Sequence, residues 1–150
     1  MADAPPKAVL DDIDRLLIRE LIADGRATLS TLAEKASLSV SAVQSRVRRL
    51  EARGVIRGYA AKVDPEALGH VLSAYIAMTP LDPSQSEHIP ELVRHIPGVE
   101  ECHSVAGDDS YLLLVRVADP RHLDQVLNEI RVTANARTRS TVVLQTFYDK

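Results

Sequence analysis

The sequence predicts an α+β chain in which a helix-turn-helix segment is followed by a ferredoxin-like βαββαβ arrangement. Three observations predict this fold class. Apolar residues recur at helical spacing in three consecutive segments before residue 54, and from residue 71 the pattern changes to strand, helix, strand, strand, helix, strand. The charge divides in the same way, with ten basic and seven acidic residues between Leu10 and Lys62 but seven basic and thirteen acidic residues between Val63 and Lys150. A basic module that meets an anion and an acidic module with another task are expected.

Length and composition limit the function classes. A chain of 150 residues can hold one ordinary domain or two small ones, and 45% hydrophobic with 26% charged residues is typical of soluble globular proteins. No apolar run approaches the roughly 20 residues of a membrane span, and the first residues lack the features of a secretory signal. We therefore expect a cytoplasmic protein without a membrane partner. The single Cys102 cannot form an internal disulfide.

Two helices are expected at the start of the chain. The first is "LDDIDRLLIRELIADGR", residues 10–26, where acidic residues crowd the positive end of the helix dipole and Gly25 suits a left-handed C-cap. The second covers residues 29–36 with Thr28 as its N-cap. The helical spacing of the first segment is carried by Leu10, Ile13, Leu17 and Leu21.

A third helix follows after a three-residue turn. It covers residues 39–53, "SVSAVQSRVRRLEAR", with Ser39 as N-cap and Gly54 as a stop signal. Its apolar stripe consists of Val40, Val43, Val47 and Leu50, and the opposite face carries Ser41, Ala42, Ser45, Arg48 and Arg49. Arg46 and Arg53 lie near the edge of the stripe, where pairing with an acid is at least as favoured as a phosphate contact.

The outer face of this helix has the chemistry of a DNA-reading surface. Small residues allow close approach to base edges, and guanidinium groups can fork onto phosphate or guanine. The alternative is a charged face that only meets water. The DNA interpretation gains from the preceding helix-turn and from residues 55–62, which add Arg57 and Lys62 without an acid.

The rest of the chain divides at a hinge. We expect a helix-turn-helix domain with a connecting strand at 1–63, a hinge at 64–70 and a second domain at 71–150. The connecting segment 55–63 has the composition of a short strand or ribbon. Ser86 and the pair Asp119 and Pro120 suit helix starts. The expected elements are strand 71–78, helix 86–96, strand 98–106, turn 107–110, strand 111–118, helix 120–132 and strand 140–148.

The chain resembles the Lrp/AsnC family of feast/famine transcriptional regulators, over nearly its whole length. The most specific part is residues 38–69, which follow the family pattern of LS, V, R, V, RLE, G, I, GY, A and DP with LG. The resemblance implies a winged helix-turn-helix domain, a hinge strand and a ferredoxin-like domain that dimerises and binds effectors, usually amino acids. It also implies assembly of dimers, commonly into octamers, with effector pockets between dimers.

The resemblance also places the functional residues. The recognition helix is Ser39 to Arg53, and Ser37 stands where the family often has a turn glycine. We expect an effector to change the assembly or the spacing of the DNA-binding domains, on a palindromic site with half-sites roughly 34 Å apart or a multiple of it. The residues assigned to DNA are Ser39, Ser41, Gln44, Ser45, Arg48 and Arg49, with Arg57 as backbone support.

The effector loop departs from the family. "GDDSY" at 107–111 matches a Gly-Asp-aromatic-Asp-Tyr pattern at Gly107, Asp108 and Tyr111, but has Asp109 and Ser110 in the middle. A carboxylate suits an α-ammonium group, and turn N–H groups suit an α-carboxylate. The alternative is an ordinary Asp- and Gly-rich hairpin turn. Thr138 and Ser140 are assigned to the same pocket.

Other functions find less support. His88 with Glu91 and Cys102 with His103 could be metal ligands, but neighbouring strand residues point to opposite faces. No nucleophile with a base and no phosphate loop is found, so no enzyme, no metal and no cofactor are expected. The competing hypothesis is a small-molecule binding module or ferredoxin-like enzyme whose first domain only contacts proteins. The basic first segment argues against it.

Overall fold

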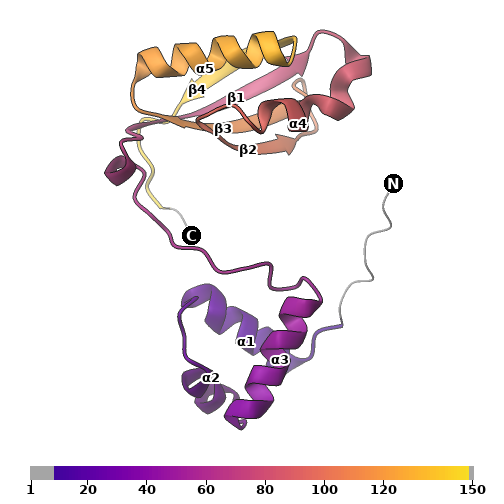
Figure 1. The fold of residues 1–150 in the computed structure, drawn as a ribbon, viewed down its shortest axis with the longest axis vertical. Coiled ribbons are helices and arrows are strands. Elements are labelled where there is room, and N and C mark those ends of the chain that lie inside the picture. Colours follow the sequence, from indigo (N-terminus) through magenta and orange to yellow (C-terminus); the bar gives the residue numbers. More distant parts are fainter. Residues whose placement is uncertain (1–8, 149–150) are drawn as a thin grey trace. The chain divides into compact units, whose positions relative to one another are not determined.

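The structure is a computed structural model that describes residues 9–148, apart from the side chains of residues 83, 85 and 86. The chain divides after Lys62 into two compact units, and each is described by itself (Figure 1). No helix among the described residues is both apolar and long enough to cross a lipid bilayer.

The first unit consists of three helices, α1 (Asp12–Ala23), α2 (Leu29–Ala36) and α3 (Val40–Ala52). Each begins at a side chain that accepts a hydrogen bond from a backbone N–H of the first turn, which would otherwise lack a partner. Asp11 caps α1, and the predicted caps Thr28 and Ser39 are confirmed at α2 and α3.

Two of the three helix ends have the left-handed backbone conformation that the sequence suggests for them. Ser37 follows α2 in the left-handed region with φ 53°, at the position where the family often has glycine, and Gly54 follows α3 with φ 67°. The prediction for Gly25 was wrong, because α1 ends at Ala23, the capping residue Asp24 is extended, and Gly25 does not have a positive φ. The Asp24 carboxylate accepts the Arg26 N–H at 2.9 Å, and this local turn replaces a left-handed cap.

The core of the first unit lies between the three helices. Val43, Val47 and Leu50 of α3 are buried as predicted. Val40 was predicted in the same stripe but is 46% exposed, because it begins the helix one turn before the first core contact. The buried residues packed together are Leu17, Leu32, Ala33, Val43 and Val47.

The strand or ribbon predicted at 55–63 is not formed. The structure assigns no strand there, and Tyr59 and Val63 are 51% and 54% exposed. A strand needs a neighbouring strand for its backbone groups, and this segment is not part of the one sheet found in the described chain.

The second unit contains four strands with helices between them. The elements are η1 (Glu66–Leu68), β1 (Leu72–Pro80), η2 (Pro83–His88), α4 (Ile89–Val93), β2 (Val99–Ser104), β3 (Tyr111–Val117), α5 (Pro120–Thr133) and β4 (Ala136–Val142). The strands form one antiparallel sheet in the order β2-β3-β1-β4, which confirms the βαββαβ prediction. Helix α5 begins at Pro120 with Asp119 as the cap, as predicted.

Two elements of this unit differ most from their predicted ranges. The helix expected at 86–96 is the 3-10 turn η2 followed by the five-residue α4, and the side chain of Ser86, its predicted cap, lies outside the described residues. The last strand, expected at 140–148, is β4 at Ala136–Val142. Asn135, with φ 43°, turns the chain directly from α5 into this strand, where Ala136 pairs with Pro80.

One face of the sheet carries the core. Ile76, Met78, Leu113 and Val115 are fully buried and pack with residues of α4 and α5. Among the described residues of this unit, no helix covers the opposite face, and Tyr75 on it is 44% exposed.

Candidate nucleic-acid interface and effector pocket

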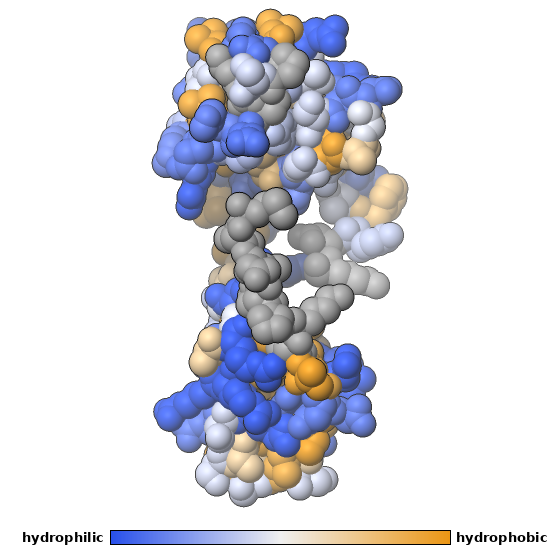
Figure 2. Space-filling model, turned by 90° about the vertical axis from the view of Figure 1, so that its right-hand side faces the viewer, coloured by the Kyte–Doolittle hydropathy of each residue, from blue (hydrophilic) through white to orange (hydrophobic). Residues whose placement is uncertain are grey.

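The outer face of α3 is exposed as the helical pattern predicts. Ser41, Ser45, Arg48 and Arg49 are exposed, and Gln44 is half-buried beside them. Ser39 caps the helix through the Ala42 N–H at 3.3 Å, so its hydroxyl has a local partner. The side of this unit drawn in Figure 2, at the bottom of the picture, is largely hydrophilic with scattered apolar residues.

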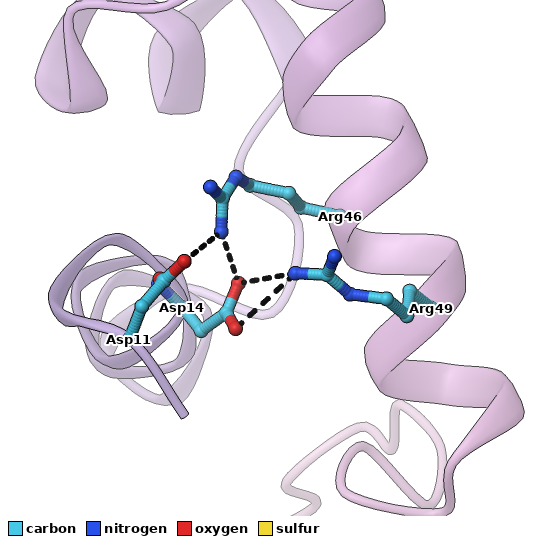
Figure 3. Close-up of polar contacts among 4 residues, drawn as sticks. All are labelled: Asp11, Asp14, Arg46 and Arg49. Carbon is cyan, nitrogen blue, oxygen red and sulfur yellow. Dashed lines mark hydrogen bonds and ion pairs between the residues drawn. The ribbon is translucent and has the colours of Figure 1, made fainter. Parts of the chain in front are cut away.

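Arg46 joins α3 to the start of α1. Its Nη1 donates to Asp11 Oδ2 at 2.6 Å and to Asp14 Oδ1 at 2.7 Å (Figure 3). The Asp14 carboxylate is only 2% exposed. The hydrogen bonds from Arg46 to the two aspartates raise the pKa of its guanidinium, so its charge is secure. The expectation that Arg46 pairs with an acid is confirmed.

Arg49 also has an acidic partner, which the sequence did not predict. Its Nη2 lies 3.3 Å from each oxygen of Asp14, while its side chain is 51% exposed. The two arginines therefore meet one buried carboxylate (Figure 3).

The other arginines near α3 are differently placed. Within the described part of the chain, Arg48, Arg53 and Arg57 are exposed and make no ion pair. Arg53 was expected to pair with an acid because it lies near the apolar stripe, but the described residues provide no such partner. Their guanidinium groups are available to a phosphate.

The sequence did offer a signal for Asp14. In helical spacing Asp14 falls on the same stripe as Leu10, Leu17 and Leu21, so a charged residue stands on the buried face of α1. A buried carboxylate requires a cationic partner, and α3 supplies two.

A pocket of about 280 Å³ lies at one edge of the sheet. Both carboxylate oxygens of Asp109 have partners there: Oδ1 accepts from Thr79 Oγ1 at 3.3 Å, and Oδ2 accepts from Arg139 Nη2 at 2.6 Å. The loop is held to β1 by the Ser110 N–H, which donates to the Met78 carbonyl at 3.1 Å. The residues lining this effector pocket are Thr79, Asp108, Asp109, Arg137, Thr138 and Arg139.

The pocket collects three of the seven predicted effector residues, Asp108, Asp109 and Thr138. It also contains Arg137, Arg139 and Thr79, which sequence reasoning missed. Strand pairing brings them together, since Thr79 lies opposite Arg137 and Ala77 opposite Arg139. Carboxylates beside guanidinium groups can bind a zwitterion by charge-assisted hydrogen bonds.

Four predicted residues do not line the pocket. Gly107 is exposed with φ 151°, a backbone conformation that side chains rarely adopt, and Ser110 is half-buried. Tyr111 is 8% exposed and belongs to the core of the sheet. Ser140 lies farther along β4, opposite Ile76.

The cysteine and histidine considered as metal ligands lie apart. Cys102 pairs with Leu113 and His103 with Leu112, which confirms that they occupy opposite faces of β2. His103 Nε2 lies 2.9 Å from Glu101 Oε2. Burial raises the pKa of the Cys102 thiol.

Comparison with known proteins supplies two family matches. A family described as Lrp/AsnC ligand binding domain matches residues 73–150, and one described as winged helix-turn-helix DNA-binding matches residues 10–57.

The HTH-type transcriptional regulator LrpA of Mycobacterium tuberculosis is 66% identical over 139 residues, which are 93% of each chain. The leucine-responsive regulatory protein of Escherichia coli is 36% identical over 145 residues, covering 93% of this chain and 88% of the other. A solved structure of the feast or famine regulatory protein from M. tuberculosis complexed with L-methionine matches with a TM-score of 0.91 and 65% identity, covering 94% of this chain and 96% of the other.

Proposed function

The chain belongs to the Lrp/AsnC family of transcriptional regulators, and we propose that it recognises its operator with the outer face of α3 and is regulated by an amino acid that binds in the effector pocket. It is a regulator with a helix-turn-helix DNA-binding domain, in a family whose members are not enzymes. The observation that carries the proposal is the exposed face of small and basic residues on a helix that two others hold in place.

The DNA-reading face consists of two kinds of residue. Ser41 and Ser45 are small and allow the helix to approach base edges, with Gln44 beside them and Ser39 at the helix start. Arg48 and Arg49 supply guanidinium groups on the helix, and Arg57 follows it as backbone support. Recognition helices related by a two-fold axis fit half-sites roughly 34 Å apart, or a multiple of that spacing.

The effector is an L-amino acid in this proposal. Asp108 and Asp109 suit its ammonium group, and Arg137 and Arg139 suit its carboxylate. The complex of the M. tuberculosis protein with L-methionine and the name of the leucine-responsive relative support this class of ligand. Gly107 allows the loop its backbone conformation, and Ser110 and Tyr111 attach it to the sheet, while Ser140 flanks the pocket.

Regulation requires assembly in this proposal. In it, the chain consists of a DNA-binding domain at 1–63, a hinge at 64–70 and an oligomerisation domain at 71–150. The protein acts in the cytoplasm, where it binds DNA. The open sheet face with Tyr75, and the exposed side chains of Leu144 and Phe147, offer surface for dimers and for octamers of dimers. An effector that favours one assembly changes the spacing of the recognition helices.

The experiment that tests this proposal uses the full chain and a duplex that it selects from random DNA. We expect steep salt dependence, with a slope of about −0.9 per phosphate neutralised. Light scattering with and without each amino acid measures the assembly. Equal binding of selected and shuffled duplexes contradicts the DNA part, and an unchanged size and DNA affinity with every amino acid contradicts the effector part.

A further inference from the structure

Asp14 stands where two arginines of the DNA-reading helix converge. Arg46 contacts it at 2.7 Å and Arg49 contacts both of its oxygens at 3.3 Å, although Asp14 belongs to α1 and is buried. Arg46 has Asp11 as a second acidic partner at 2.6 Å. Asp14 is therefore shared by both arginines, whereas Asp11 contacts Arg46 alone of the two.

We propose that Asp14 is a positioning residue for DNA recognition, which holds the guanidinium of Arg49 in one orientation on the outer face of α3. The inference rests on the proposed function and deepens it, because it assigns sequence selectivity to a residue that does not itself touch DNA.

The contact leaves most of the Arg49 guanidinium available. Only Nη2 faces Asp14, and half of the side chain is exposed. A guanidinium has five N–H donors, two of them on Nη2. The Nη2 hydrogen that is not bonded to Asp14 can still form a two-bond fork with guanine O6 and N7, together with the neighbouring N–H on its own edge of the guanidinium. Figure 3 shows Nη2 directed toward Asp14 and another terminal nitrogen directed away from it.

A held side chain binds more selectively than a free one. Ordering a long side chain at an interface costs affinity equivalent to about three- to tenfold, and a side chain that is already ordered avoids this cost. The gain applies where Arg49 must meet one base edge. It does not apply to DNA of the wrong sequence, where any orientation near a phosphate suffices.

Asp14 raises the affinity for the correct sequence by ordering Arg49, but its negative charge lowers the affinity for DNA of any sequence. A carboxylate behind the recognition helix lowers its attraction for phosphates, so removal of that charge strengthens binding to any duplex. Loss of Asp14 therefore separates the two affinities, whereas simple unfolding lowers both together.

Asp11 provides a matched control. Asp11 contacts Arg46 but not Arg49. The variant Asp11→Asn removes one negative charge from the start of α1, as Asp14→Asn does, and asparagine is as efficient an N-cap as aspartate. Asp14→Asn has nearly the shape of the native side chain and retains one acceptor oxygen.

The test measures binding of the full-length protein to a duplex selected by the native chain from random DNA and to a shuffled duplex of the same composition. Asp14→Asn is expected to lower the ratio of the two affinities by about three- to tenfold. Asp11→Asn should leave the ratio unchanged. In an Arg49→Ala background, Asp14→Asn should have no further effect on the ratio.

A second measurement needs no variant. Side-chain ¹⁵N relaxation in the native, DNA-free protein should show the Arg49 Nε–H nearly as ordered as that of Arg46 and more ordered than that of Arg48. Equal ratios for Asp14→Asn and Asp11→Asn, an effect of Asp14→Asn that persists without Arg49, or an Arg49 as mobile as Arg48 would each overturn the inference. Failure of the native protein to distinguish the two duplexes would instead overturn the proposed function, and the inference with it.

Discussion

Asp14 of α1 and Arg46 of α3 form an ion pair that joins these two helices of the helix-turn-helix unit, with 2.7 Å between Asp14 Oδ1 and Arg46 Nη1. The carboxylate is 2% exposed and the arginine side chain 24%. A charge withdrawn from water to this degree is tolerated only with its partner present. The pair therefore fixes α3 against α1 and sets the orientation of the DNA-reading face.

Replacement of Arg46 by alanine should destabilise this unit strongly. Asp14 would keep only the longer contacts with Arg49, and loss of one partner of a buried pair costs about 3 kcal/mol. Chemical denaturation followed by far-UV circular dichroism measures the free energy of unfolding. Arg48→Ala, on the same helix but without an ion pair among the described residues, should change it by less than about 0.5 kcal/mol. Equal losses for the two variants would contradict a stabilising role of the pair.

The Asp11 carboxylate should make stability depend on acid pH. The backbone N–H of Asp14 and the guanidinium of Arg46 lower the pKa of Asp11 from its ordinary value of 3.8. Because the unfolded chain then binds this proton more readily, the contribution of Asp11 is complete above pH 3.8 and is lost as the pH falls through the lower folded-state pKa.

Denaturation of the native protein and of Asp11→Asn over this acid range measures the effect. The stability difference between them should be constant above pH 3.8 and shrink below it. A difference that stays the same throughout the range would show that the Asp11 charge makes no contribution.

Local chemistry explains which features the sequence could predict. Thr28, Ser39 and Asp119 were recognised as caps because each cap bond joins residues three apart. The βαββαβ order followed from the periodicity of each segment. The strand expected at 55–63, which the structure does not form, and the bounds of β4 were not predictable in the same way, because a strand depends on partners far away in the sequence.

The sites show the same division. The outer face of α3 follows from its helical period, and the exposure of Ser41, Ser45 and Arg48 agrees with it. The contact between Arg49 and Asp14 joins two residues that are 35 positions apart in sequence and lie on different helices, so it depends on packing. Similarly, Arg137 and Arg139 enter the effector pocket through their register opposite β1, which no local motif encodes.

Arg48→Ala should weaken DNA binding without unfolding the protein. The variant loses one contact with a phosphate or a base. If the contact is with a phosphate, affinity should fall for all duplexes, and the slope of log affinity against log salt concentration should become smaller by about 0.9. Fluorescence anisotropy at several salt concentrations measures both quantities. Arg121→Ala on α5 removes the same charge from the other unit and should leave the slope as it is. An unchanged slope for Arg48→Ala would exclude a phosphate contact at this position.

Asp109→Asn should abolish the response to the amino acid that the native chain binds. A ligand at a hundred times its Kd stabilises the folded state by about 2.7 kcal/mol, which a thermal-shift screen of the twenty amino acids detects as a higher Tm. Asp109 faces both Thr79 and Arg139, so loss of its charge removes the partner of an ammonium group and frees Arg139 from its ion pair. Glu129→Gln, a carboxylate of α5 outside the pocket, should keep the full shift. A shift that persists in Asp109→Asn and in Arg139→Ala would mean that the amino acid binds elsewhere, because neither end of the zwitterion would then depend on this pocket.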